Sequence, residues 1–261
     1  MYRIGWFSTG RDKAARQLLA TVRDSIERGE IQTEIAFVFC SRVPGESKES
    51  DLFLALARKY GLPLICLSWQ RFVPSGEMDR RLEYDRLVMD RLDSFRVDIC
   101  LLAGYMLIVG PEMCRRYDMI NLHPATPGGP TGTWQEVIWQ LMDGRAEETG
   151  VMMHLVTPEL DRGPVATYCK FPIIGKPFDR YWREQERLPS GPPGRRSEDN
   201  RLFRAIRKHG LAREFPMIVA TLKAFSEGKV KITPDKKVVD SDWQPIRGYD
   251  LTGEIEKVIR G

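Results

Sequence analysis

Three side chains in one stretch of the sequence could together carry out acyl transfer between nitrogen atoms. Asn121 and His123 end a short apolar run, and Asp161 lies in a turn after a second apolar run, Val151 to Val156. An amide can donate a hydrogen bond to an oxygen that gains negative charge, an imidazole can carry a proton, and a carboxylate can orient the imidazole. Asn121, His123 and Asp161 are therefore the candidate catalytic residues.

Each candidate also has a plain structural explanation, because a single histidine is more often structural than catalytic. His123 ends a buried strand and precedes Pro124 and a glycine-rich loop, which favours the functional interpretation. Asp161 alone would be an ordinary turn residue between two strands. His154 lies inside an apolar strand, and we interpret it as structural.

A turn near the N-terminus could bind an anion. Residues 8–13, Ser-Thr-Gly-Arg-Asp-Lys, join an apolar strand to an amphipathic helix. Free backbone N–H groups at such a junction point toward an anion. Gly10, Arg11, Asp12 and Lys13 are the candidate ligands of a substrate phosphate. The alternative is that Asp12 only caps the helix.

Apolar runs separated by helical patterns predict an α/β fold. The runs are apolar on both faces, which is typical of a mostly parallel twisted sheet with helices on both faces. Strands are expected at residues 2–8, 33–40, 62–67, 98–102 and 119–122. Ligands of such sheets bind beyond the carboxyl ends of the strands. The first turn, the 104–110 loop and the loop after His123 all follow strand ends, so we expect them to form one site.

The composition is that of an ordinary globular protein, with 42% hydrophobic and 29% charged residues. No apolar run approaches the roughly 18 residues of a membrane span, and the strand-like start leaves no room for a signal peptide. We expect a cytoplasmic protein that does not bind membranes. The five cysteines lack zinc-site spacing, so reduced thiols and no metal are expected. A net charge of +4 does not indicate nucleic-acid binding.

One catalytic domain is expected over residues 1–175. Residues 176–200 form a basic insertion rich in Pro, Gly and Arg, interpreted as a long loop. Residues 201–261 are expected to be a C-terminal helical extension and tail of the same domain. The stretch from Lys176 to Arg213 holds eleven Lys and Arg against five Asp and Glu. This imbalance indicates either a local anionic partner or a solvated face.

Four motifs occur in an order and spacing that resemble the folate-dependent formyltransferases. They are Gly104-Tyr105-Met106, Asn121-Leu122-His123-Pro124, Thr149-Gly150-Val151 with His154-Leu155-Val156, and Asp161-Arg162-Gly163-Pro164. The resemblance covers about residues 2–175 and is nearest to the enzymes that act on glycinamide ribonucleotide in purine biosynthesis. It implies a Rossmann-like formyltransferase fold. It also implies formyl transfer from the co-substrate 10-formyltetrahydrofolate to the amine of a phosphorylated small molecule.

The resemblance implies roles for individual residues. Asn121 would hold the formyl oxygen, His123 would assist proton transfer, and Asp161 would orient this pair. The expected folate contacts are Met106, Leu107, Ile108, Val156 and Leu160. The first turn departs from the family's Ser-Gly-x-Gly-Ser-Asn, so the phosphate is either held there by Arg11 and Lys13 or no longer bound there.

Three alternatives remain open. Two are sibling enzymes, a formyltetrahydrofolate hydrolase and an amino-sugar formyltransferase. The third belongs to another class, a folate- or nucleotide-binding module without catalysis. The expected partners are a small-molecule amine and folate, with no nucleic acid, and a homodimer is compatible with the sequence.

Overall fold

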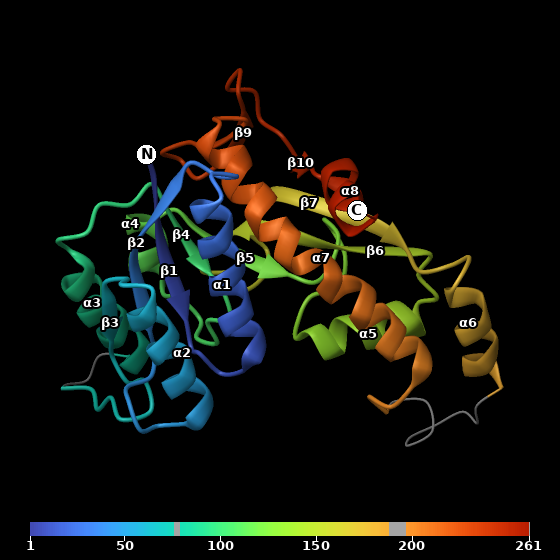
Figure 1. The fold of residues 1–261 in the computed structure, drawn as a ribbon, viewed down its shortest axis with the longest axis horizontal. Helices are drawn as coiled ribbons and strands as arrows, with labels where there is room; N and C mark the ends of the chain where they lie inside the picture. The colour runs from blue at the N-terminus through green and yellow to red at the C-terminus, as the bar shows by residue number, and fades with distance from the viewer. Residues whose placement is uncertain (76–78, 188–196, 261) are drawn as a thin grey trace.

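A computed structural model describes residues 1–75, 79–187 and 197–260. Its centre is an eight-stranded sheet with the order β10-β7-β6-β5-β4-β1-β2-β3 (Figure 1). The strands are β1 Tyr2–Ser8, β2 Thr33–Cys40, β3 Leu64–Cys66, β4 Ile99–Leu102, β5 Met119–His123, β6 Glu148–Leu155, β7 Val165–Pro172 and β10 Tyr249–Asp250, with β8 Val230–Ile232 and β9 Val238–Asp240 in a separate hairpin. The helices are α1 Lys13–Glu27, α2 Lys48–Lys59, α3 Arg80–Leu92, α4 Pro111–Arg116, α5 Trp134–Asp143, α6 Phe178–Glu186, α7 Arg201–Ser226 and α8 Thr252–Arg260.

The expected mostly parallel sheet is confirmed. Strand β1 pairs in parallel with β2 and β4, and β4 pairs in parallel with β5. The exception is β6, which runs antiparallel to both of its neighbours, β5 and β7. The carboxyl ends of β1, β4 and β5 therefore meet at one edge of the sheet, as the sequence predicts.

Helices cover both faces of the sheet because successive side chains of a strand point to opposite sides. Ile4 and Trp6 of β1 pack in a core cluster with α1, α2 and α7, whereas Phe7 packs in a second cluster with α3 and α4. Gly5 lies between Ile4 and Trp6 in the strand, and the ring of Phe37 packs directly against it. A Cβ atom on Gly5 would lie only 2.6 Å from that ring. The long α7 crosses the molecule beside α1 and continues toward α5 and α6 (Figure 1).

The interpretation of residues 176–200 as a loop is wrong in part, because α6 occupies Phe178–Glu186. Phe178 is buried in a third cluster with α5 and the first half of α7. Trp182 Nε1 donates a 2.6 Å hydrogen bond to the Ile173 carbonyl. The aromatic residues thus attach a helix whose other side chains are mostly polar. Residues 188–196 of the expected insertion lie outside the described residues.

The expected C-terminal tail completes the sheet. Strand β10 pairs in parallel with β7, and Leu251 and Ile255 bury their side chains in the core. Ile246 and Tyr249 also pack against this core, so apolar contacts and backbone pairing together dock the tail. Within the described part of the chain, no helix is long and apolar enough to cross a membrane.

Candidate functional site

Two loops that were expected to meet are joined by hydrogen bonds. Thr9, after β1, donates its backbone N–H to the Gly104 carbonyl at 3.0 Å. Its hydroxyl oxygen accepts from the Met106 N–H at 2.9 Å. The first turn and the 104–110 loop therefore hold each other in place at the carboxyl edge of the sheet.

An apolar cavity of about 370 Å³ opens at this edge. Its walls come from the 104–110 loop and from the segment after β6. All five predicted folate contacts line it: Met106, Leu107, Ile108, Val156 and Leu160. Met106, Ile108 and Leu160 are exposed although they are large and hydrophobic. Exposed apolar side chains gathered around a cavity are typical of a ligand site.

A second, charged cavity of about 390 Å³ lies next to the first. Its charged walls are Arg11 and Asp12 of the first turn and Arg207 and Glu214 of α7. His123 and Trp134 also line it. The charged side chains indicate a polar ligand, in contrast to the apolar cavity.

Asn121 and Asp161 line both cavities. His123 belongs to the charged cavity and His154 to the apolar one. A group bound in one cavity would thus meet a group bound in the other beside an amide, a carboxylate and two imidazoles. This arrangement suits the transfer of a small group between two bound molecules.

Local backbone geometry explains the Asp-Arg-Gly-Pro turn. Asp161 has a φ of 53°, in the left-handed region that aspartate tolerates better than most residues. A Cβ on Gly163 would lie 1.7 Å from the Leu155 carbonyl oxygen, so no larger residue fits there. The turn can then fold tightly against the end of β6 and direct the Asp161 carboxylate to the imidazoles.

His123 is held as a neutral imidazole with a defined tautomer. Its Nε2 lies 2.9 Å from the Pro130 carbonyl, which can only accept, so Nε2 carries the hydrogen and Nδ1 keeps a lone pair. Burial lowers the pKa of His123 below its usual value, while the Pro130 carbonyl and the Asp161 charge oppose the shift. Its Nδ1 faces Asp161 Oδ2 at 3.9 Å.

Asp161 lies between the two imidazoles. Its Oδ1 is 3.6 Å from His154 Nε2, and its side chain is 9% exposed. A hydrogen bond with His154 is the largest effect that lowers the pKa of Asp161; burial opposes it, and the Gly132 N–H acts in the same direction as His154. Asp161 is therefore a carboxylate at neutral pH and can stabilise a positive charge on His123.

His154 is part of the site, although the sequence interpretation treated it as structural. It pairs with Asn121 across β5 and β6. Its Nδ1 lies 3.1 Å from the Leu155 carbonyl oxygen, and its Nε2 lies 3.5 Å from Asn121 Nδ2. His154 thus contacts the Asn121 amide from the apolar-cavity side. Only the cross-strand register reveals this contact.

The predicted phosphate ligands divide into two pairs. Arg11 and Asp12 line the charged cavity, whereas Gly10 and Lys13 do not. Asp12 is the N-cap of α1, and its carboxylate accepts from the Ala15 N–H at 3.0 Å. The capping alternative therefore describes Asp12 correctly, and phosphate binding by this turn stays a prediction.

The sequence analysis did not select Trp134, Arg207 or Glu214, which line the charged cavity. The last two lie on α7, outside every motif, and reach the charged cavity only because α7 packs against α5. Glu214 places a carboxylate in this cavity. Seven-residue spacing on a helix was the only available signal, because it puts Arg207 and Glu214 on one face.

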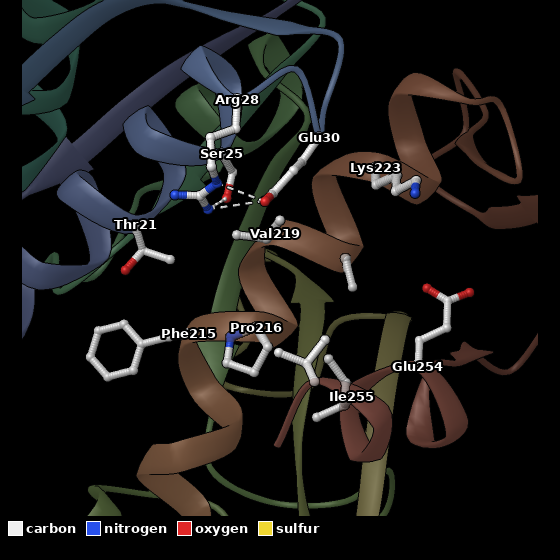
Figure 2. A pocket seen from close by; sticks show the side chains of 12 residues that line it. Thr21, Ser25, Arg28, Glu30, Phe215, Pro216, Val219, Lys223, Glu254 and Ile255 are labelled. Carbon is white, nitrogen blue, oxygen red and sulfur yellow. Dashed lines mark hydrogen bonds and ion pairs between the residues drawn. The ribbon is translucent and has the colours of Figure 1, made fainter. Parts of the chain in front are cut away.

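Another cavity is separate from this site. It measures about 520 Å³ and lies between α1, α7 and α8 (Figure 2). Phe215, Pro216 and Ile255 form its apolar part, and an Arg28–Glu30 ion pair lies at its rim. None of the candidate catalytic residues lines it. Within the described ranges, no cluster of three or more His, Cys, Asp or Glu residues could hold a metal ion.

The fold and the paired cavities define a class of group-transferring α/β proteins, and comparison with known proteins identifies the family. The formyl transferase family model matches residues 12–178, so this chain belongs to the formyl transferase family. The phosphoribosylglycinamide formyltransferase of Escherichia coli (strain K12) is 26% identical over 239 residues, which cover 88% of this chain and 92% of that protein.

Two solved structures have the same fold. The phosphoribosylglycinamide formyltransferase from Coxiella burnetii, in complex with CHES, superposes with a TM-score of 0.70 at 19% identity over 95% of this chain and 98% of that one. The formyltetrahydrofolate deformylase from Burkholderia mallei superposes with a TM-score of 0.62 at 19% identity, over 92% of this chain and 69% of that one. The predicted formyltransferase fold is confirmed.

Proposed function

We propose that this protein transfers a formyl group from 10-formyltetrahydrofolate to the amine of glycinamide ribonucleotide, a step of purine biosynthesis. The observation that carries the proposal is that Asn121 and Asp161 line two adjoining cavities of different chemical character. A two-substrate transfer needs such a junction. The name of the Escherichia coli relative supports the choice of acceptor.

The apolar cavity is suited to the folate. The pterin ring has faces that can stack on apolar side chains and hydrogen-bonding atoms at its edge, and the cavity offers exposed Met106, Ile108 and Leu160 beside polar residues. Asn121, His154 and Asp161 are among these polar residues. The bound folate would present its formyl group beside these residues, because they lie where the apolar cavity joins the charged one.

The charged cavity is suited to the amine acceptor. An amine must lose a proton when it takes a formyl group, and His123 Nδ1 offers a lone pair at the wall of this cavity. Proton uptake makes His123 positive, and the Asp161 carboxylate 3.9 Å away stabilises that charge. When the bond between the formyl carbon and N10 of the folate breaks, the proton passes to N10, which leaves as tetrahydrofolate. Asn121 Nδ2 supplies a hydrogen bond to the formyl oxygen as it gains negative charge.

A second candidate is hydrolysis of the formyl group, as in the structurally similar deformylase. Water would then take the place of the amine. The charged cavity favours transfer over hydrolysis, since water needs no binding site of about 390 Å³ with five charged side chains. An amino-sugar acceptor is a further alternative for the same cavity, and a folate-binding module without catalysis would not need His123 beside Asp161.

The decisive experiment measures tetrahydrofolate release from 10-formyltetrahydrofolate with glycinamide ribonucleotide, with an amino-sugar nucleotide, and with no acceptor. We expect release to depend on glycinamide ribonucleotide and to yield the formylated product by mass spectrometry. Equal release without an acceptor would establish the hydrolase instead. Release only with the amino-sugar nucleotide would change the acceptor and keep the chemistry.

A further inference from the structure

Helix α7 brings two opposite charges to the acceptor side of the site. Arg207 and Glu214 lie two turns apart on α7 and both line the charged cavity. Their side chains are 24% and 11% exposed, so neither is an ordinary surface charge. Neither belongs to a motif that the sequence analysis selected.

Two contacts hold the Arg207 guanidinium in place. Its Nη1 donates a 2.5 Å hydrogen bond to Glu214 Oε1. Its central carbon lies 4.5 Å from the ring centroid of Trp134, at the start of α5. Trp134 packs in turn against Phe203 of α7. A guanidinium fixed by a carboxylate and by an aromatic face loses little freedom when it binds a ligand.

Arg207 keeps hydrogen-bond donors for a ligand. A guanidinium has five N–H groups in a rigid fork. Over the ranges that the structure describes, one hydrogen bond of this side chain is seen, from Nη1 to Glu214. The Nε and Nη2 donors are therefore available beside the cavity, and this geometry matches two oxygens of one oxyanion.

The first turn is a weaker anion site than its sequence suggests. The Gly10 N–H donates to Ser8 Oγ, and the Thr9 N–H donates to Gly104. The Asp12 carboxylate occupies the start of α1, where a phosphate would otherwise benefit from the helix dipole. Lys13 does not line the cavity.

We propose that Arg207 binds the anionic group of the acceptor, an oxyanion such as a phosphate monoester, in place of the first turn. This inference rests on the proposed function because it assumes that the protein binds an acceptor. It does not depend on which acceptor that is. Glu214 has a defined part: it positions the guanidinium and also weakens anion binding by like-charge repulsion. Removing the charge of Arg207 and removing that of Glu214 should consequently have opposite effects.

The test is direct binding of ribose 5-phosphate, with ribose and ribonate as comparison ligands, measured by isothermal titration calorimetry at low salt. We expect the unmodified protein to bind ribose 5-phosphate and not ribose. Arg207→Gln should weaken binding by about tenfold or more, because charge-assisted hydrogen bonds are lost. Glu214→Gln should tighten binding severalfold. Lys13→Ala is the matched control, a cation of the first turn outside the cavity, and should change affinity less than about twofold.

Arg207→Lys separates charge from geometry, since lysine keeps the charge but cannot pair with two oxygens at once. It should recover only part of the lost affinity, and thermal unfolding will show that each variant is folded. Stronger Arg207-dependent binding of ribonate than of ribose 5-phosphate would support the oxyanion site and identify a carboxylate acceptor. Unchanged affinity in Arg207→Gln, or a larger loss in Lys13→Ala, would overturn the inference. Formyl transfer to glycinamide ribonucleotide by the unmodified protein would then still support the proposed function.

Discussion

Nδ1 of His123 lies 3.9 Å from Oδ2 of Asp161, too far for a hydrogen bond and close enough for a strong charge interaction. In the neutral imidazole both atoms carry lone pairs, because the hydrogen of His123 is on Nε2. The carboxylate therefore contributes only when His123 becomes positive. Burial keeps His123 neutral before the reaction, and Asp161 stabilises the proton that arrives during it.

This relationship predicts how Asp161→Asn changes the pH dependence. The Asp161 charge raises the pKa of His123 against the larger effect of burial. Removing that charge should lower the pKa of His123 further, so the histidine should stay neutral to a lower pH. Titration of the His123 ring protons by NMR measures this directly. The acidic limb of kcat/KM should move to lower pH, while kcat falls at every pH. An upward shift of the His123 pKa would contradict the assigned geometry.

Asn121→Ala should slow turnover and leave folate binding nearly unchanged. Loss of one hydrogen-bond donor to a developing oxyanion costs on the order of 10²–10³ in rate. The interaction is stronger in the transition state than in the bound substrate, so kcat should fall while the dissociation constant of the folate stays close to its normal value. Single-turnover kinetics with folate fluorescence would measure both. Near-normal kcat would remove Asn121 from the mechanism.

The fold was predictable because its strands are apolar on both faces and alternate with helices. The parts that could not be predicted depend on tertiary contacts. Helix α6 is polar apart from the aromatic residues that attach it, and β10 forms only because β7 offers a free edge. A local sequence pattern cannot predict the attachment of α6 or the pairing of β10 with β7.

The candidate site also has residues that could be predicted from the sequence and residues that could not. Asn121 and His123 could be selected because they end a buried strand. His154 could not, because an imidazole in an apolar strand acquires its role only through the register that sets it opposite Asn121. Arg207 depends on how α7 crosses α5, which the sequence does not specify.

Leu160→Ala tests the apolar cavity. The Leu160 side chain is 60% exposed in the absence of a ligand, so a bound folate would cover it. Burial of apolar surface contributes about 25 cal/mol per Å², so the truncation should raise the dissociation constant of the folate about 5- to 20-fold. Leu52→Ala is the matched control: Leu52 is also an exposed leucine, on α2 and away from the cavity. Equal effects of the two variants would mean that Leu160 does not contact the folate.

Asp85 supports the 104–110 loop, and its contribution to the stability of the fold depends on pH. This α3 carboxylate is buried and accepts a 2.6 Å hydrogen bond from the Gly110 N–H, where α4 begins. Burial raises the pKa of Asp85 to about 6 from its usual 3.8, although the Gly110 N–H and the Arg81 charge oppose the shift. The folded protein therefore holds this proton more tightly than the unfolded chain does.

Because the folded-state pKa is raised, the contribution of Asp85 to stability should fall as pH rises from about 4 to about 6 and stay constant above. Asp85→Asn keeps an acceptor for Gly110 without the charge. Relative to the unmodified protein, its free energy of unfolding should increase by on the order of 2–3 kcal/mol between pH 4 and pH 7. Urea denaturation across this range measures the difference. Asp90→Asn, an exposed change on the same helix, should show no such trend, and Asp85→Ala should be destabilised at every pH because Gly110 loses its acceptor. A pH-independent difference between Asp85→Asn and the unmodified protein would show that burial does not raise this pKa.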